Sequence, residues 1–392
     1  MKIAIYSGDI PSTTFIEHLI KGVAETHDVL LFGTRKEAIF YDNRRIKVYG
    51  VSKHRILRLI QVKWRVFLLL LRYPSRFKRA LKEVNKLDSY YNKYNAFCKV
   101  VPVLLYLPDV FHVQWAKDLE KWLFLKTAFG VKLIVSLRGA HINYSPIAEP
   151  QLADSYRNNF PEVDGFHAVS AAIAREAQQY GAPKDSIEVI HSLVPKVTFE
   201  QFATYKKREG NVVRLVSVGR FHWKKGYRYA LDAVKMLKDK GLSVSYTIIS
   251  SNSITEDILF QMHQLDLKNE VTVLNGLPQQ QLFETMKTFD CLLLPSLEEG
   301  IANVVLEAMA LGIPVVSTNC GGMAEVVVPN ETGWLVPVRD PETLAEAIQT
   351  VCQTPEADLQ RIVLNAHGFV KTHFNAEAGI KQFLGLYESL FE

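Results

Sequence analysis

The chain has 392 residues, a net charge of +5, a hydrophobic fraction of 48% and a charged fraction of 22%. This composition excludes disordered and fibrous proteins, and the length predicts two domains of roughly 150 to 200 residues each. The apolar runs are shorter than the ~20 residues that cross a bilayer, and "MKIAIYSGD" at the N-terminus is not expected to be a signal peptide. The four cysteines lack metal-like spacing, so we expect buried, reduced thiols.

Strand-like and helix-like segments alternate through the first half of the chain. Such alternation is typical of a parallel sheet covered by helices. The expected strands are Lys2–Tyr6, Asp28–Phe32, Arg45–Val48, Val110–Val113, Lys132–Leu137, Gly165–Val169 and Ile187–Ile190. The first half is therefore predicted to be a Rossmann-like domain.

One stretch of this half is strongly basic. Residues 51–100 contain 13 Lys and Arg against two acids, a local net charge of +11. Six apolar side chains recur there at helical spacing: Ile56, Leu59, Ile60, Trp64, Phe67 and Leu71. They indicate either a surface helix packed on the first domain, or a peripheral membrane anchor whose cations, within residues 53–86, meet anionic lipid. Nucleic acid is not an expected partner.

The second half repeats the alternation after the polar stretch "VTFEQFATYKKREGN" at residues 197–211, which we interpret as a linker. The expected strands are Val213–Val218, Ser243–Ile249, Val271–Leu274, Cys291–Pro295 and Pro314–Ser317. The expected helices between them are Tyr227–Lys238, Thr255–Leu265 and Gln279–Thr288. Two further signals set helix ends: Gly312 stops the helix before it, and Asp340-Pro341 starts another.

The loop "VGRFHWKKG" in the second half is a candidate anion site. Arg220 directly follows a predicted strand, and Lys225 precedes the next predicted helix. A guanidinium, an ammonium and a helix N-terminus together suit a diphosphate. The alternative is a solvated basic turn.

The motif "EEGIANVVLEAMALG" combines a helix start with two acids. The backbone N–H groups of this helix start are expected to face a ligand, and the candidates are Gly300, Ile301, Ala302, Asn303 and Val304. Glu307 is placed to accept hydrogen bonds from a ribose diol, and Glu299 from hydroxyls of an attached sugar. The alternatives are a helix-dipole acid for Glu299 and a surface residue for Glu307. The later "NCGGMAEVV" is interpreted as a tight turn.

Three segments of the second half resemble glycosyltransferase family 4, the retaining enzymes of the GT-B fold. They are "VSVGRFHWKKGYRYALDAVKML", "LLLPSLEEGIANVVLEAMALGIPVVSTNCGGMAEVV" and "NETGWLVPVRDPETLAEAI". The resemblance implies that Arg220 and Lys225 hold the donor diphosphate, that Glu299 contacts the transferred sugar and that Glu307 contacts the ribose. It also implies an α/β fold of two Rossmann-like domains that face each other across a cleft. We place these domains at residues 1–205 and 206–375, with a helix at 376–392 that returns to the first.

The first half resembles the family through "SGDIPSTTFIEHLIKGVA", in which Gly8 would allow the donor to approach the backbone. In "VSLRGAHINYSP", Arg138-Gly139 stands where the family often carries His-Gly, and His141 follows three residues later. The resemblance leaves open whether Arg138 or His141 contacts the reacting sugar. The segments "IISSNSITED" and "IEVIHSLVP" also depart from the family pattern.

The predicted activity is retaining transfer of a sugar from a UDP- or GDP-linked donor to a lipid-linked or polysaccharide glycan, without a metal or other cofactor. We expect a cytoplasmic enzyme, attached to the inner face of the cell membrane if the basic stretch is an anchor. The alternatives are a nucleotide-sugar epimerase or hydrolase of the same fold, and a non-catalytic membrane-associated partner.

Overall fold

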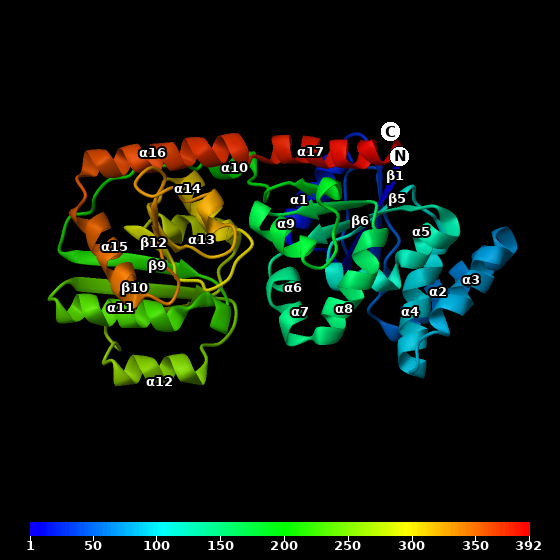
Figure 1. The fold of residues 1–392 in the computed structure, drawn as a ribbon, viewed down its shortest axis with the longest axis horizontal. Coiled ribbons are helices and arrows are strands. Elements are labelled where there is room, and N and C mark those ends of the chain that lie inside the picture. The colour runs from blue at the N-terminus through cyan, green and yellow to red at the C-terminus, as the bar shows by residue number, and fades with distance from the viewer. The chain divides into compact units, whose positions relative to one another are not determined.

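The computed structural model describes residues 1–392 and divides into two compact units, each an α/β domain with a parallel sheet. Unit 1 consists of Met1–Val169, Ala174–Ile190 and Gly379–Glu392. Unit 2 consists of Ser170–Ile173 and His191–Ala378 (Figure 1). The predicted α/β class with two Rossmann-like domains is therefore confirmed.

Unit 1 is built on an eight-stranded sheet of order β3-β2-β1-β5-β6-β7-β8, in which β4 also pairs with β2. All these pairings are parallel. The strands are β1 (Lys2–Ile10), β2 (Asp28–Arg35), β3 (Ile46–Val48), β4 (Val51–Ser52), β5 (Val110–Val113), β6 (Lys132–Leu137), β7 (Gly165–Ala168) and β8 (Ile187–Val189). Since the strands are parallel, their carboxyl ends share one edge of the sheet and their amino ends share the other.

The helices of unit 1 cover this sheet. They are α1 (Thr14–Val23), α2 (Arg55–Arg72), α3 (Pro74–Val84), α4 (Tyr90–Leu105), α5 (Leu123–Phe129), α6 (Ala140–Asn143), α7 (Ser145–Ala148), α8 (Pro150–Asn159), α9 (Ala171–Gln178) and α17 (Ala376–Glu388). The chain re-enters unit 1 at Gly379, and Ile380 of α17 lies against Gly22 of α1. The predicted return of the C-terminal helix to the first domain is thus confirmed.

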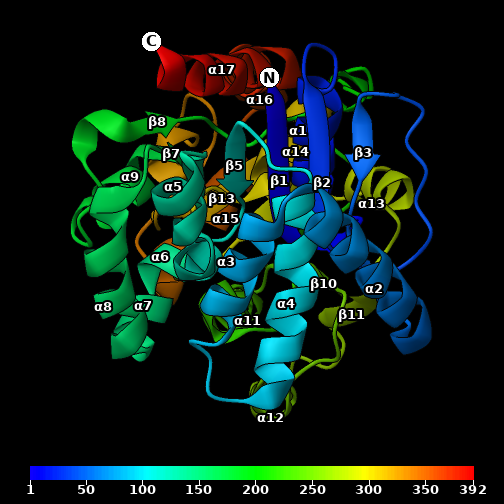
Figure 2. The same ribbon diagram turned by 90° about the vertical axis from the view of Figure 1, so that its right-hand side faces the viewer.

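Helices α2, α3 and α4 lie side by side (Figure 2). Helix α2 buries only Val62 and Leu69. The six apolar residues that were expected at helical spacing are all exposed: Ile56, Leu59, Ile60, Trp64, Phe67 and Leu71. Helix α2 is thus a surface helix that packs on unit 1 through Val62 and Leu69, and the six apolar side chains lie on its exposed surface. No helix of the structure combines the length and the apolar character needed to cross a bilayer.

Unit 2 is built on a six-stranded sheet of order β11-β10-β9-β12-β13-β14, again parallel throughout. The strands are β9 (Val212–Val218), β10 (Ser243–Ser250), β11 (Val271–Asn275), β12 (Cys291–Leu294), β13 (Val315–Thr318) and β14 (Trp334–Val336). The helices are α10 (Lys196–Phe199), α11 (Tyr227–Asp239), α12 (Glu256–Gln264), α13 (Gln279–Met286), α14 (Asn303–Leu311), α15 (Pro341–Gln353) and α16 (Glu356–His373).

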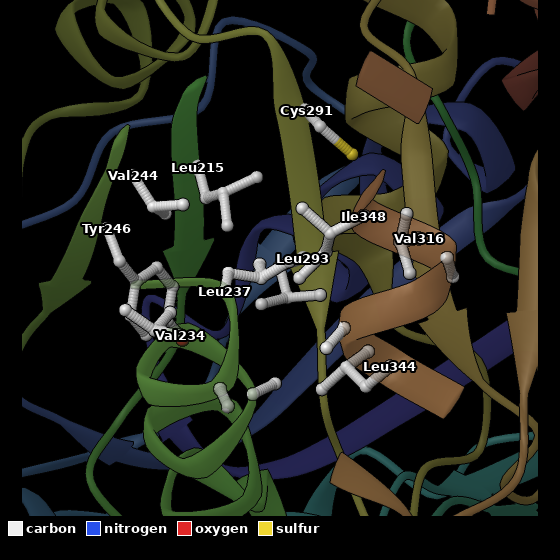
Figure 3. Close-up of a cluster of buried hydrophobic side chains, with 14 of the residues drawn as sticks. Leu215, Val234, Leu237, Val244, Tyr246, Cys291, Leu293, Val316, Leu344 and Ile348 are labelled. Atoms are coloured by element: carbon white, nitrogen blue, oxygen red, sulfur yellow. The ribbon is translucent and has the colours of Figure 1, made fainter. Parts of the chain in front are cut away.

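The core of unit 2 forms around central strands that are buried on both faces, such as β12 and β13, as parallel sheets between helices require. Figure 3 shows one side of this core, where Val234 and Leu237 of α11 and Leu344 and Ile348 of α15 pack with side chains of the sheet. The predicted helix ends are confirmed. Gly312 follows α14 with a φ of 87°, and the Asp340 carboxylate accepts the Thr343 N–H at 2.9 Å at the start of α15.

The stretch 197–211 differs from its interpretation as a polar linker. Phe199 lies at the end of α10, and both Phe199 and Tyr205 are buried in the core of unit 2. Unit 2 accordingly begins at His191, before the expected boundary at residue 205. The aromatic side chains outweigh the charged residues around them because burial of a large ring is strongly favourable.

Candidate active site

The loop after β9 carries two of the predicted site residues, Arg220 and Lys225. It is held against the end of β12, since the Leu297 N–H donates to the Lys224 carbonyl at 2.6 Å. Gly226 makes this packing possible. Its φ is +64°, and a Cβ there would lie 2.0 Å from the Pro295 carbonyl oxygen. The motif therefore needs glycine both for backbone conformation and for space.

Glu299 is buried, with 7% of its surface exposed, and is surrounded by cations. The Nζ of Lys225 donates to its Oε1 at 2.6 Å, and the Ser296 hydroxyl donates to the same oxygen at 3.0 Å. The Nζ of Lys224 lies 3.6 Å from Oε2. Burial works to raise the pKa of Glu299, but the two lysines and these hydrogen bonds outweigh it and hold the pKa below its usual value. Glu299 is therefore a carboxylate at neutral pH.

Lys225 and Glu299 thus belong to one ion pair, although the sequence suggested separate contacts for them. The pair leaves Nζ protons of Lys225 and lone pairs of Glu299 available. A phosphate and a sugar hydroxyl can use these groups without breaking the pair.

The backbone around Glu299 packs against the turn formed by Gly321 and Gly322. The Gly322 N–H donates to the Gly300 carbonyl at 2.8 Å. A Cβ on Gly321, whose φ is +53°, would lie 1.6 Å from the Glu299 carbonyl oxygen. The "CGG" segment is a turn, as predicted, and it also holds the backbone of the Glu299 loop in position.

Helix α14 begins directly after this loop. Its N-cap residue, Ala302, provides no side-chain hydrogen bond. Ile301, Ala302 and Val304 are buried, whereas Asn303 at the first helical position is exposed. The Ala302 N–H donates to Met323 Sδ at 3.4 Å, but the N-cap side chain leaves the first N–H groups within α14 uncapped, an arrangement that favours an anion.

Glu307 lies one turn into α14. Gln279 of α13 donates to its Oε1 at 3.4 Å, and burial raises the pKa of Glu307 to about 7. Glu299 and Glu307 therefore differ in charge near neutral pH: the first is ionised, and the second is close to half protonated.

This pKa gives a testable expectation for ligand binding. A diol donates two hydrogen bonds to the ionised form of Glu307, so the affinity for a nucleoside diphosphate should rise as the pH rises through 7. From pH 6 to pH 8 the gain should be roughly tenfold. Titration calorimetry of the wild type and of Glu307→Gln measures it. The nucleotide's own phosphate titrates equally in both proteins, so the same pH dependence in both would contradict a diol contact at Glu307.

A cavity of about 440 Å³ opens beside these groups. Its walls come from the carboxyl ends of β9, β10 and β11 and from the loop after β9. The lining residues are Val218, Gly219, Arg220, His222, Lys224, Lys225, Ile249, Ser251, Gly276, Leu277 and Leu282. Three cations and two glycines in one wall suit a phosphorylated ligand that approaches the backbone closely. The sequence analysis missed Lys224, which stands next to Lys225 in the same motif.

In unit 1, Arg138 and His141 both lie near the Trp115 ring. The Arg138 guanidinium is 5.9 Å from the Trp115 ring centroid and 4.2 Å from that of Phe15. The ring centroid of His141, on α6, is 5.4 Å from that of Trp115. The structure therefore brings Arg138 and His141 together. Burial, assisted by Lys117, lowers the pKa of His141, so this imidazole is neutral at pH 7.

Two neighbours of Arg138 and His141 were not predicted from the sequence, Gln114 and Trp115. The Nη2 of Arg138 donates to the Gln114 side-chain oxygen at 2.9 Å. Both residues directly follow the predicted strand Val110–Val113, a position that could have indicated them. Gly8 lies at the same edge of the sheet, with a φ of +84° and open space where a side chain would be. The β1–β2 register shifts between Tyr6 and Gly8.

A buried chain of hydrogen bonds runs beneath these residues. His167 Nε2 is 2.8 Å from the Ile190 carbonyl, which accepts only, so Nε2 carries the proton. The Ser136 hydroxyl then donates to His167 Nδ1 at 2.8 Å and accepts from His112 Nε2 at 2.9 Å. His112 Nδ1 consequently accepts the Tyr387 hydroxyl at 2.8 Å. The Ile190 carbonyl thus determines the tautomers of both histidines. The hydrogen bond from Tyr387 to His112 links α17 to the sheet.

Comparisons with known families match both halves of the chain. The model of the family "Glycosyl transferases group 1" matches residues 199–367, and that of the "Glycosyl transferase 4-like domain" matches residues 12–192. No group of three or more His, Cys, Asp or Glu side chains is placed to hold a metal ion.

Two bacterial relatives are named as polysaccharide glycosyltransferases. The amylovoran biosynthesis glycosyltransferase AmsK of Erwinia amylovora is 30% identical over 66% of this chain and 64% of its own length. The putative colanic acid biosynthesis glycosyltransferase WcaL of Escherichia coli K12 is 29% identical over 60% of this chain and 59% of its own length. The matches thus span less than two thirds of either relative.

Solved structures resemble the whole chain. Anabaena Alr3699/HepE, in complex with UDP and glucose, has a TM-score of 0.71 at 17% identity and covers 99% of this chain and 100% of its own. Sucrose-phosphate synthase from Thermosynechococcus elongatus has a TM-score of 0.75 at 16% identity and covers 100% of this chain and 99% of its own. At these identities the likeness shows a shared fold.

Proposed function

Because the chain belongs to the group 1 glycosyl transferases, with the GT-B fold, we propose that it transfers a sugar from a nucleoside diphosphate to a glycan acceptor in polysaccharide biosynthesis. The observation that carries the proposal is the cationic cavity of unit 2, whose Lys224 and Lys225 pair with the buried Glu299. The relatives named for amylovoran and colanic acid biosynthesis support a polysaccharide or lipid-linked acceptor.

In this proposal the cavity of unit 2 receives the donor. Arg220, Lys224 and Lys225 contact the diphosphate, together with the backbone from Gly300 to Val304. Glu307 accepts the ribose hydroxyls, and Glu299 accepts hydroxyls of the transferred sugar. A UDP- or GDP-linked sugar fits these contacts equally, and Alr3699/HepE, a protein of the same fold, was solved with UDP-glucose.

The reaction breaks the bond between the anomeric carbon and a diphosphate oxygen, and the nucleoside diphosphate leaves with the bonding electrons. Negative charge therefore grows on the phosphate, where the cations and the N-terminus of α14 stabilise it. We propose that these groups supply the stabilisation without a metal ion. We further propose that the acceptor hydroxyl oxygen bonds to the anomeric carbon with retention of configuration, and that its proton passes to the departing diphosphate. In this proposal Gly8 and either Arg138 or His141 contact the donor near the reacting carbon.

Replacement of Arg220 or Lys225 by alanine tests the diphosphate contacts. Each variant should bind the bare nucleoside diphosphate at least tenfold more weakly, because each lost charge-assisted hydrogen bond is worth about 1.5–3 kcal/mol. Titration calorimetry measures the affinity, and Lys240→Ala, an exposed cation after α11, serves as control. Unchanged affinity in both variants would place the diphosphate elsewhere.

We also propose that the enzyme attaches to the anionic inner face of the membrane through α2. Trp64 and Phe67 are 60% and 55% exposed, and their rings stack at 5.7 Å. Four cations alternate with these apolar residues along the helix and are not matched by acids: Arg55, Arg58, Lys63 and Arg72. An apolar face with cations at its borders is the arrangement of helices that lie in a membrane interface.

Vesicle sedimentation tests this attachment. The wild type should sediment with anionic vesicles at low salt and less at high salt, because exposed charges are screened. Trp64→Ala/Phe67→Ala should sediment much less, whereas Phe260→Ala, which removes an exposed ring of unit 2, should match the wild type. Equal, negligible sedimentation with neutral and anionic vesicles would contradict attachment of the enzyme to the membrane.

A further inference from the structure

A second large cavity, of about 570 Å³, lies in unit 1. Its lining includes Lys2 and Asp28, the first residues of β1 and β2, and Asp109 and Val131, which directly precede β5 and β6. These positions mark the amino edge of the parallel sheet. Gly8 and Arg138 belong to the opposite, carboxyl edge, so this cavity is separate from the candidate active site.

The charges of the lining are unbalanced. Lys2, Lys47, Arg72 and Arg76 face only two acids. Both acids have partners, since Asp28 pairs with the Lys47 ammonium at 3.1 Å, and Asp109 accepts the Lys2 backbone N–H at 2.7 Å.

The two arginines have no carboxylate partner. Arg76 donates to the Leu104 carbonyl at 3.0 Å and lies 4.1 Å from the Tyr73 ring centroid. Arg72 is exposed at the C-terminal end of α2. Their guanidinium donors are therefore left for an anion.

The rest of the lining combines tyrosine hydroxyls with an apolar surface. The Tyr49 and Tyr106 rings stack at 3.6 Å, and Tyr73 is the third aromatic residue. Leu68, Leu105 and Leu107 are among the apolar residues. Such a wall can hold a phosphate at its cations and an aliphatic stem beside it.

The cavity shares α2 with the proposed membrane surface. Leu68 and Arg72, four residues apart, line the cavity from one face of the helix. Trp64, Phe67 and Leu71 recur at helical spacing on the adjoining surface of the helix and are exposed.

We propose that this cavity is a binding site for a phosphate ester, with Arg72 and Arg76 as the phosphate ligands. A membrane lipid whose head group ends in a phosphate, and a soluble phosphate ester, offer the same chemistry. The site is independent of sugar transfer, so its failure would leave the donor site unaffected.

The test compares two double variants of equal charge loss. Arg72→Gln/Arg76→Gln removes the cavity cations, and Lys78→Gln/Lys82→Gln removes two exposed cations of α3 outside the cavity. Sedimentation with phosphatidylcholine vesicles containing phosphatidic acid should show roughly tenfold weaker binding for the arginine variant than for the lysine variant, because only the former loses specific hydrogen bonds. Equal losses, without stabilisation by glycerol 3-phosphate that depends on the two arginines, would mean diffuse attraction and would overturn the site.

A second arm identifies the source of the phosphate. Glycerol 3-phosphate is added without vesicles, and thermal unfolding is followed. Stabilisation of the wild type that is lost in the arginine variant, with equal vesicle binding of both double variants, would assign the site to a soluble ester. The single variant Arg72→Gln guards against a folding defect, since Arg72 makes no hydrogen bond that unit 1 needs. An Arg72→Gln protein that keeps full binding in both arms would contradict the proposal.

Discussion

Replacement of Glu299 by alanine is expected to lower the rate of sugar transfer by about 10²–10³, with nearly unchanged affinity for the nucleoside diphosphate. Losses of this size are seen when one contact to the transition state is removed. The affinity should hold because, in the proposed function, Glu299 contacts the sugar rather than the phosphate. Loss of its carboxylate also frees Lys225, its partner at 2.6 Å, for the diphosphate.

Steady-state kinetics and titration calorimetry measure these two effects separately. Glu299→Gln should behave like Glu299→Ala in rate, because the amide has no charge and one acceptor oxygen in place of two, so it cannot both pair with the lysines and accept from the proposed sugar hydroxyl as the carboxylate does. Glu331→Gln, at an exposed position of unit 2, is the matched control. A normal rate with weak nucleotide binding would reverse the roles assigned to Glu299 and Glu307.

The second large effect is expected for Gly321→Ala. A Cβ at this position would lie 1.6 Å from the Glu299 carbonyl oxygen, so the Glu299 loop must move. A displacement of about 1 Å in a site costs on the order of 10² in rate. Gly321→Ala should therefore remain folded with lower stability and lose most of its transfer activity.

Gly241→Ala supplies the matched control. Gly241 also has a positive φ, +81°, but nothing lies within 4 Å of its added Cβ. Both variants pay about 1–2 kcal/mol for the left-handed backbone, and only Gly321→Ala also displaces the loop. Thermal unfolding and initial rates distinguish the two. An active Gly321→Ala protein would show that the turn does not position Glu299.

Most strands could be predicted because each is an apolar run bounded by polar or turn residues. Cys291–Pro295 was expected where β12 is Cys291–Leu294, and Lys132–Leu137 is β6. The missed strands, β4 and β14, are two and three residues long and too short to show a period. For α2 the spacing left two interpretations open, since apolar residues at helical spacing normally indicate burial but also occur in helices that lie in a membrane interface.

The chemistry of the candidate site was predictable where it lies within one motif, as with Arg220 and Lys225 or Glu299 and Glu307. Contacts between segments that are far apart in the sequence could not be predicted. Lys225 and Glu299 are 74 residues apart, and neither motif indicates that they form an ion pair. The hydrogen-bond chain from Tyr387 to His112 joins residues 275 apart for the same reason: tertiary packing, and no local pattern, brings them together.

The central claim is that unit 2 binds a nucleotide sugar at the cationic cavity. Thermal unfolding of the wild type and of Arg220→Ala with a panel of UDP- and GDP-linked sugars tests it most directly, because a ligand that binds only the native state stabilises it by about 2.7 kcal/mol at 100 times its Kd. We predict that at least one nucleotide sugar raises the Tm of the wild type by several degrees, that the free sugar does not, and that the rise is largely lost in Arg220→Ala. No rise with any member of the panel, or an equal rise in both proteins, would contradict the claim.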